Sequence, residues 1–138
     1  MADDLKDIEA VLQTYFDGLH EGDTDKLIAA FHETADLRSV QADGSLAVLP
    51  RAAWMEMVRS RPSASSQKLS RRDFVVSIDR SSPSTAFAKV HCQIPPRYFT
   101  DYLALAKLAG GWKIVSKTFH TDTREGCVRA GAGQVGDA

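Results

Sequence analysis

The most informative segment of this chain is Tyr98-Phe-Thr-Asp-Tyr-Leu-Ala-Leu-Ala-Lys-Leu-Ala-Gly-Gly-Trp-Lys-Ile-Val-Ser-Lys-Thr-Phe-His120. Two segments of alternating apolar and polar residues flank its Gly-Gly pair, so the sequence predicts a β-hairpin. The turn is either Ala109-Gly110 or Gly110-Gly111. Both turns place odd positions of the first strand and even positions of the second on one face of the sheet. This face assignment decides which side chains point into the protein.

One face of the predicted hairpin is expected to lie beneath the helices. It carries Asp101, Leu103, Leu105, Trp112, Ile114, Ser116, Thr118 and His120. The strand before the hairpin adds a uniformly apolar row, consisting of Ala86, Ala88, Val90, Cys92 and Ile94. The opposite face is too apolar to be left in water and is typical of a subunit interface, so it predicts a homodimer. Its residues are Phe87, Lys89, His91, Tyr102, Val115, Lys117 and Phe119.

The rest of the chain predicts helices before most of the strands. Apolar residues at helical spacing indicate a helix over residues 4–20, and a shorter one that contains Leu27, Ile28 and Phe31. Short strands over residues 35–40 and 45–49 flank an Asp-Gly turn, and a third helix follows Pro50. Long strands are expected over residues 72–79 and 84–94. This order predicts an α+β fold, with three helices packed on one face of an antiparallel sheet.

Length and charge exclude several classes of protein. The chain has 138 residues and a formal charge of −1, from 17 basic and 18 acidic residues, which argues against a nucleic-acid partner. We expect a single domain over residues 1–121 and a Gly- and Ala-rich tail over residues 122–138. No apolar run is long enough to cross a membrane, and the acidic start does not resemble a signal peptide. Two distant cysteines, Cys92 and Cys127, fit a reducing cytoplasm.

Several segments together resemble a known family. Tyr15-Phe16-Asp17-Gly18, Gly22-Asp23, Leu27 and Phe31-His32 resemble the nuclear transport factor 2-like (NTF2-like, or SnoaL-like) superfamily. Phe99-Thr-Asp-Tyr-Leu and the segment from Gly111 to His120 resemble, more narrowly, its putative lumazine-binding branch. The resemblance covers the chain to about Thr121. One departure is Glu33, which stands where such chains often have Pro.

The resemblance implies an NTF2-like, cystatin-like cone in which a strongly bent sheet encloses three helices. It also implies a deep pocket between sheet and helices, and a homodimer formed through the outer sheet face. The superfamily contains enzymes, such as ketosteroid isomerase, beside non-catalytic binding modules, so the fold does not determine the function. The function that we predict is the binding of a small, largely apolar or aromatic molecule. The expected pocket residues are Tyr15, Phe31, Trp54, Val90, Leu103, Trp112, Thr118 and His120.

Asp101 and His120 are the candidate catalytic residues. A carboxylate beside an imidazole orients the ring and keeps its proton affinity near neutrality, as a general acid–base pair requires. The alternative is a strand-end pair that only satisfies two polar groups. If the protein is an enzyme, we expect isomerisation or dehydration without a cofactor, with His120 as the base. A third hypothesis is a purely structural dimer whose cavity is filled by side chains.

Other chemistry has little support in the sequence. There is no phosphate-binding loop, no Gly-x-Gly-x-x-Gly and no Gly-x-Ser-x-Gly, so no nucleotide cofactor is expected. Neither His20-Glu21 nor His32-Glu33 continues into His-Glu-x-x-His, so no metal site is expected. Cys92 is interpreted as a small hydrophobic residue in an apolar row. The Tyr15 hydroxyl is expected either to donate a hydrogen bond into the pocket or to lie at its rim.

Overall fold

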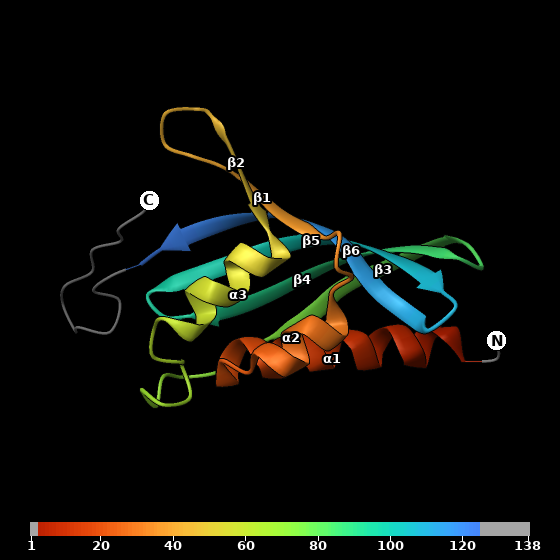
Figure 1. The fold of residues 1–138 in the computed structure, drawn as a ribbon, viewed down its shortest axis with the longest axis horizontal. Helices are drawn as coiled ribbons and strands as arrows, with labels where there is room; N and C mark the ends of the chain where they lie inside the picture. Colours follow the sequence, from red (N-terminus) through yellow and green to blue (C-terminus); the bar gives the residue numbers. More distant parts are fainter. Residues whose placement is uncertain (1–2, 125–138) are drawn as a thin grey trace.

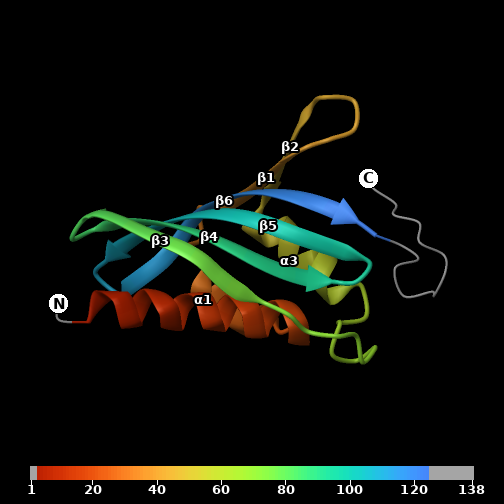
Figure 2. The same ribbon diagram turned by 180° about the vertical axis from the view of Figure 1, so that it is seen from behind.

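The computed structural model describes residues 3–124 and consists of three helices and a curved six-stranded sheet (Figure 1). The elements are α1 (Asp4–Glu21), α2 (Thr24–Ala30), β1 (Asp36–Val40), β2 (Leu46–Pro50), α3 (Arg51–Arg59), β3 (Phe74–Ser82), β4 (Thr85–Ile94), β5 (Arg97–Leu108) and β6 (Gly111–Thr123). All three helices lie on the same side of the sheet (Figures 1 and 2). The α+β fold predicted from the sequence is therefore confirmed. β6 runs two residues past the expected domain end, and residues 125–138 of the expected tail lie outside the described part.

The sheet has the strand order β2-β1-β6-β5-β4-β3. Strands β3 to β6 form the predicted antiparallel meander. The short hairpin β1–β2 joins the other edge of β6, and its tip projects away from the body of the protein (Figure 1). β1 runs parallel to β6, with Leu37 opposite Lys117, so the sheet is not antiparallel throughout. This pairing joins segments about eighty residues apart, which local sequence patterns do not reveal.

Helix α1 matches its prediction to within one residue, whereas α2 ends at Ala30, so Phe31, which was expected in the helix, lies just beyond it in an extended conformation. Ile8, Leu12 and Tyr15 recur at helical spacing and are fully buried on one face of α1. Gly22 ends α1 in the left-handed conformation, with φ of 67°, and its N–H bonds the Gly18 carbonyl. The Asp23 side chain then caps α2 by accepting hydrogen bonds from the backbone N–H groups of residues 25 and 26. The two helices therefore form a tight hairpin beneath the sheet.

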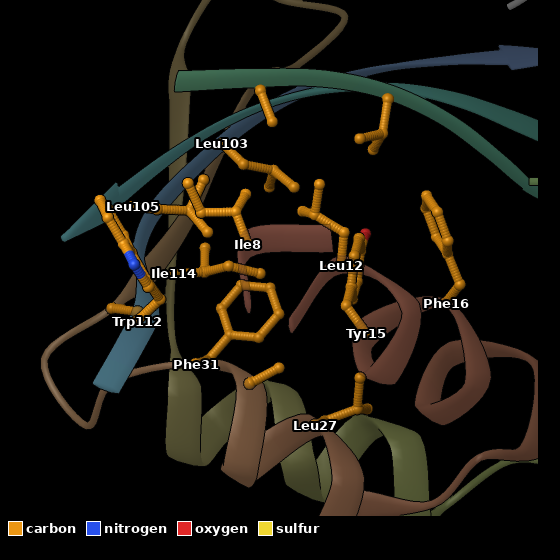
Figure 3. Close-up of a cluster of buried hydrophobic side chains, with 14 of the residues drawn as sticks. Ile8, Leu12, Tyr15, Phe16, Leu27, Phe31, Leu103, Leu105, Trp112 and Ile114 are labelled. Carbon is orange, nitrogen blue, oxygen red and sulfur yellow. The ribbon is translucent and has the colours of Figure 1, made fainter. Parts of the chain in front are cut away.

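The core fills the space between the helices and the sheet (Figure 3). The ring of Phe31 stands edge-on to Tyr15 and Trp54, with centroid distances of 5.2 and 5.0 Å. Above the helices, sheet residues including Leu103, Leu105, Trp112 and Ile114 complete the cluster (Figure 3). Trp112 and Ile114 point inward, as predicted.

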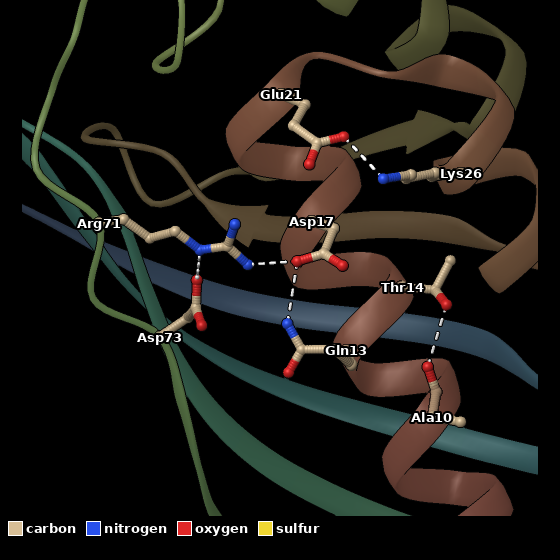
Figure 4. A network of polar contacts seen from close by, with 8 residues as sticks. All are labelled: Ala10, Gln13, Thr14, Asp17, Glu21, Lys26, Arg71 and Asp73. Carbon is tan, nitrogen blue, oxygen red and sulfur yellow. Dashed lines mark hydrogen bonds and ion pairs between the residues drawn. The ribbon is translucent and has the colours of Figure 1, made fainter.

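Polar contacts hold both ends of α1 against the rest of the protein. At its start, the Asp4 carboxylate accepts hydrogen bonds from Lys107 Nζ (2.9 Å) and Trp112 Nε1 (3.3 Å), which hold the pKa of Asp4 below its usual value. Toward its end, Arg71 from the segment before β3 bonds Asp17 of α1, and Gln13 supports the same carboxylate (Figure 4). The Arg71 hydrogen bond lowers the pKa of Asp17. These contacts fix the helix against the strands that form the site described below.

A β-bulge in β6 reverses the face assignment for the second half of that strand. Leu108 pairs with Gly111, so the turn is Ala109-Gly110. Leu105 pairs with Ile114 but Ala104 pairs with Ser116, so Val115 is an extra residue in β6. One extra residue moves every following side chain to the opposite face. Lys117 therefore points inward and is only 4% exposed, whereas Thr118 and His120 are exposed on the outer face.

Candidate ligand-binding site

A cavity of about 160 Å³ lies between the helices and the bent sheet. The helices contribute Leu19, Trp54 and Met57 to its lining. The sheet contributes Leu37, Leu49, Ile94, Phe99 and Phe119. A smaller recess of about 40 Å³ adjoins it and shares Trp54 and two arginines with it. The lining is therefore mainly apolar and partly aromatic.

The polar residues of the cavity are mostly cationic. They are Arg61 after α3, Arg97 at the start of β5, and Lys117 and Thr121 of β6. Among the described residues that line the cavity, none is an aspartate or a glutamate. The electrostatic character of the cavity is thus positive.

Lys117 carries a buried ammonium group at the cavity wall. Its Nζ donates a hydrogen bond to Tyr15 Oη at 2.7 Å and lies 3.7 Å from Asp101 Oδ2. The same nitrogen lies 5.0 Å from the ring centroid of Trp54 and 4.7 Å from that of Phe119. Aromatic faces attract a cation, and this attraction is stronger where water is excluded. Asp101 and the rings together keep this charge inside the protein.

Tyr15 and Asp101 lie behind Lys117, deeper in the core. Both are fully buried, and the Tyr15 hydroxyl donates to Asp101 Oδ2. Burial, followed by the negative charge of Asp101, raises the pKa of Tyr15 well above its usual value. The hydroxyl therefore remains protonated and is committed to Asp101, so it does not donate into the cavity.

Cys92 completes this buried cluster. Its Sγ lies 3.7 Å from Asp101 Oδ2 and 3.9 Å from Tyr15 Oη. Burial, assisted by the nearby carboxylate, raises the pKa of the Cys92 thiol far above its usual value. A thiol that stays protonated is a poor nucleophile. The interpretation of Cys92 as a small hydrophobic residue agrees with this environment.

The predicted catalytic pair is not formed. Asp101 pairs across the sheet with Phe119 and points inward, whereas the His120 side chain is 72% exposed on the other face. His120 instead bonds Asp122, with Nε2 3.1 Å from Oδ1. The prediction that Asp101 and His120 share a face is wrong because it assumed unbroken alternation, which the bulge at Val115 interrupts.

The predicted pocket residues fall into three groups. Trp54 lines the cavity, but Tyr15, Phe31, Val90, Leu103 and Trp112 are buried in the core and do not line it. Thr118 and His120 lie on the outer face, so their predicted inward orientation is wrong.

The predicted interface residues fall into two groups, those on the outer face and those that point inward. Phe87 and Tyr102 are exposed on the outer face and stack with centroids 5.8 Å apart. Lys89 lies over Tyr102, the His91 ring contacts that of Phe74 at a tilt, and Val115 is half-buried at the bulge. Lys117 and Phe119 point inward instead, so their assignment to the outer face is wrong for the reason given above.

Two larger hollows lie outside this site. One of about 300 Å³ contains His91 and Thr100, and one of about 330 Å³ lies between the β1–β2 hairpin and His120. Neither is lined by Tyr15, Asp101 or Lys117. The cavity beside Lys117 differs from both in combining mainly apolar walls with a buried charge.

Comparison with known proteins places this architecture in a family. The family described as "Putative lumazine-binding" matches residues 3–120. The chain belongs to this family. A search of curated proteins finds no match.

Solved structures of NTF2-like proteins share the fold of this chain. An NTF2-like protein of unknown function from Methylobacillus flagellatus KT is 28% identical, with a TM-score of 0.75 over 88% of this chain and 94% of that chain. One from Shewanella baltica OS155 is 26% identical, with a TM-score of 0.76 over 87% and 94%. A ketosteroid isomerase-like protein from Erwinia carotovora atroseptica SCRI1043 is 16% identical, with a TM-score of 0.66 over 88% and 98%, and shows the fold alone.

Sequence reasoning missed four residues that define the site of this family member. Arg61 and Arg97 come together only in three dimensions, so no local pattern marks them. Lys117 and Phe119 left a weak signal in the sequence. The apolar residues of β6 occupy even positions up to Ile114 and an odd position at Phe119, and the change falls at the adjacent pair Ile114-Val115. Such a change of phase indicates a bulge.

Two further observations concern residues 3–124. This part of the chain contains no group of three or more His, Cys, Asp or Glu side chains arranged to hold a metal ion. It also contains no helix with the length and apolar character needed to cross a membrane.

Proposed function

We propose that this protein binds a small, largely apolar or aromatic molecule in the cavity between α1, α3 and the sheet. The observation that carries the proposal is a mainly apolar cavity with a buried ammonium group at its wall. Ligand sites typically combine apolar walls with a few polar groups that fix orientation. Membership of a family described as lumazine-binding supports the binding of a small molecule.

The geometry does not support the alternative that the protein is an enzyme using Asp101 and His120. It required Asp101 and His120 to act on one ligand, and these side chains lie on opposite faces of the sheet. Asp101 is also fully buried behind Lys117. The purely structural alternative requires a cavity filled by side chains, whereas about 160 Å³ is open. We therefore favour binding over both alternatives.

A ligand screen by thermal shift tests the proposal. Met57, which is 40% exposed on α3 and lines the cavity, can be replaced by Trp to obstruct it. Compounds that raise the melting temperature of the wild type should have little effect on Met57→Trp. A ligand at a hundred times its Kd stabilises the folded state by about 2.7 kcal/mol, which is readily measured.

The matched control places the same side chain one residue earlier. Glu56 is exposed and does not line the cavity, so Glu56→Trp should respond to ligands as the wild type does. If the compounds stabilise Met57→Trp as strongly as the wild type, the binding site lies elsewhere. If no small apolar or aromatic compound stabilises the wild type, the proposed function is wrong.

We propose in addition that the protein is a homodimer through the outer sheet face. The stacked rings of Phe87 and Tyr102 are 46% and 42% exposed, and Phe74, which contacts His91 further along β4, is 43% exposed. An exposed aromatic patch rimmed by polar residues is typical of an interface. A net charge of −1 offers little repulsion between two copies.

The single buried thiol among the described residues is also consistent with the predicted cytoplasmic location.

Sedimentation velocity tests the dimer. The wild type should sediment as a dimer at micromolar concentration, and Phe87→Lys should sediment as a monomer because it places a charge within the stacked patch. Leu5→Lys is the control, since Leu5 is 48% exposed on α1, in the helical layer. It should remain dimeric. A monomeric wild type would rule out the dimer.

A further inference from the structure

We infer that the cavity binds an organic acid, whose carboxylate is held by Arg61 and Arg97 while Lys117 donates to an oxygen deeper inside. This inference rests on the proposed binding function and adds the chemical class of the ligand. Three features of the cavity support it, and each concerns a different part of its lining.

The first feature is a pair of arginines without acidic partners. Among the described residues, Arg38, Arg59, Arg71, Arg80 and Arg124 all form ion pairs with carboxylates. Four arginines of this part form no such pair. Arg51 donates to backbone carbonyls and Arg72 lies over the Phe74 ring, whereas Arg61 and Arg97 line the cavity. The Arg97 guanidinium instead lies 5.9 Å from the ring centroid of Phe99, which also lines the cavity. The two guanidinium groups are therefore available to an incoming anion.

The second feature is the mutual repulsion of these two arginines. Arg97 is half-buried, and burial together with the positive charge of Arg61 lowers its pKa. Arg61 is exposed, and both arginines line the same cavity, so an anion bound between them would reduce the repulsion between their charges. A carboxylate suits this position because its two oxygens match the planar donors of a guanidinium group.

The third feature is the unused hydrogen-bonding capacity of Lys117. An ammonium group has three donors, and the only acceptor bonded to Lys117 among the described residues is Tyr15 Oη. The Asp101 carboxylate, at 3.7 Å, balances its charge but lies beyond ordinary hydrogen-bond distance. The rings of Trp54 and Phe119, which surround the nitrogen, also line the cavity. A ligand oxygen placed between those rings would satisfy a buried donor.

Charge balance then assigns the two ends of the ligand. Asp101 compensates Lys117, so the uncompensated positive charge belongs to Arg61 and Arg97. The anionic end of the ligand therefore lies at the arginines. The apolar wall between them and Lys117 accommodates an aromatic or aliphatic body.

Isothermal titration calorimetry with matched acids and amides tests this inference. The probes are benzoate, cinnamate, 2-naphthoate and octanoate, each compared with its own neutral amide. The acids should bind more tightly than their amides. Arg97→Gln should weaken acid binding by roughly tenfold or more, as expected for the loss of a charge-assisted contact, and Arg61→Gln/Arg97→Gln should weaken it further. Amide binding should change little, and only acid binding should weaken as salt is raised.

The matched control is Arg59→Gln, which removes the same charge from α3. Arg59 pairs with Glu56 and does not line the cavity, so acid binding should be unchanged. If acids and amides bind equally and Arg97→Gln affects neither, the inference is wrong while the proposed function stands. An equal loss in Arg59→Gln also overturns it, because the effect would be one of net charge. If no acid binds, this inference is wrong, and the thermal-shift screen decides separately whether the proposed function stands.

Discussion

Replacing Asp101 by Asn is expected to lower the free energy of unfolding by about 3–5 kcal/mol, although the new side chain has nearly the same shape. The reason is Lys117, which is 4% exposed and has Asp101 as its only carboxylate partner among the described residues. Removing one member of a buried ion pair leaves the other charge desolvated and uncompensated. Guanidinium chloride denaturation followed by tryptophan fluorescence measures the change.

A double variant distinguishes charge compensation from simple loss of packing. Lys117→Met alone should also destabilise the protein, because it leaves the Asp101 carboxylate buried without a cation. Combining Asp101→Asn with Lys117→Met removes both charges and should recover most of the lost stability. Asp122→Asn is the exposed control and should have an effect within about 0.5 kcal/mol. If the two losses simply add in the double variant, the proposed coupling between Asp101 and Lys117 is absent.

Leu27→Ala is expected to lower the free energy of unfolding by about 2–5 kcal/mol, because it opens a cavity where α2 packs against α1. Leu27 is fully buried, and its Cγ would lie only 3.0 Å from a Cβ added at Gly18. The same substitution at Leu108, which is 41% exposed beside the β5–β6 turn, should cost much less. Urea denaturation of both variants, with the same probe, measures the difference.

The close approach of Gly18 to Leu27 provides an internal check. In the wild type, Gly18→Ala places a methyl group against Leu27, which offsets the gain in helix propensity. In the Leu27→Ala background that contact is relieved and the methyl group occupies part of the new space. Gly18→Ala should therefore be more favourable in the Leu27→Ala protein than in the wild type. Equal effects in the two backgrounds would show that the helices do not interlock here.

Features set by local sequence were predicted well. The extent of α1 follows from apolar residues at helical spacing, and the predicted helix over residues 4–20 is observed as Asp4–Glu21. The buried row of β4 follows from strict alternation, and Ala86, Ala88, Val90 and Cys92 are all buried. The inward orientation of Trp112 and Ile114 follows from the same rule because these residues precede the bulge.

The site itself was predicted poorly, for two physical reasons. The first is the bulge. Ile114 and Val115 are both apolar and either could point inward, so the alternation of apolar and polar residues does not show which residue is the extra one. The second is distance along the chain. Tyr15, Asp101 and Lys117 come from α1, β5 and β6, and Arg61 and Arg97 from a loop and a strand start. Their meeting depends on strand register and helix placement rather than on neighbouring residues.

The extra residue in β6 also affects how relatives should be compared. A homologue with identical letters at the end of this strand but one residue fewer before them would turn its lysine to solvent and its threonine and histidine toward the helices. Residues aligned with each other in the two sequences would then lie on opposite faces of the sheet. Family members should therefore be aligned by the residues that pair between β5 and β6 before a ligand preference is inferred from one for another. A one-residue gap near Val115 marks members whose interior residues differ in chemistry.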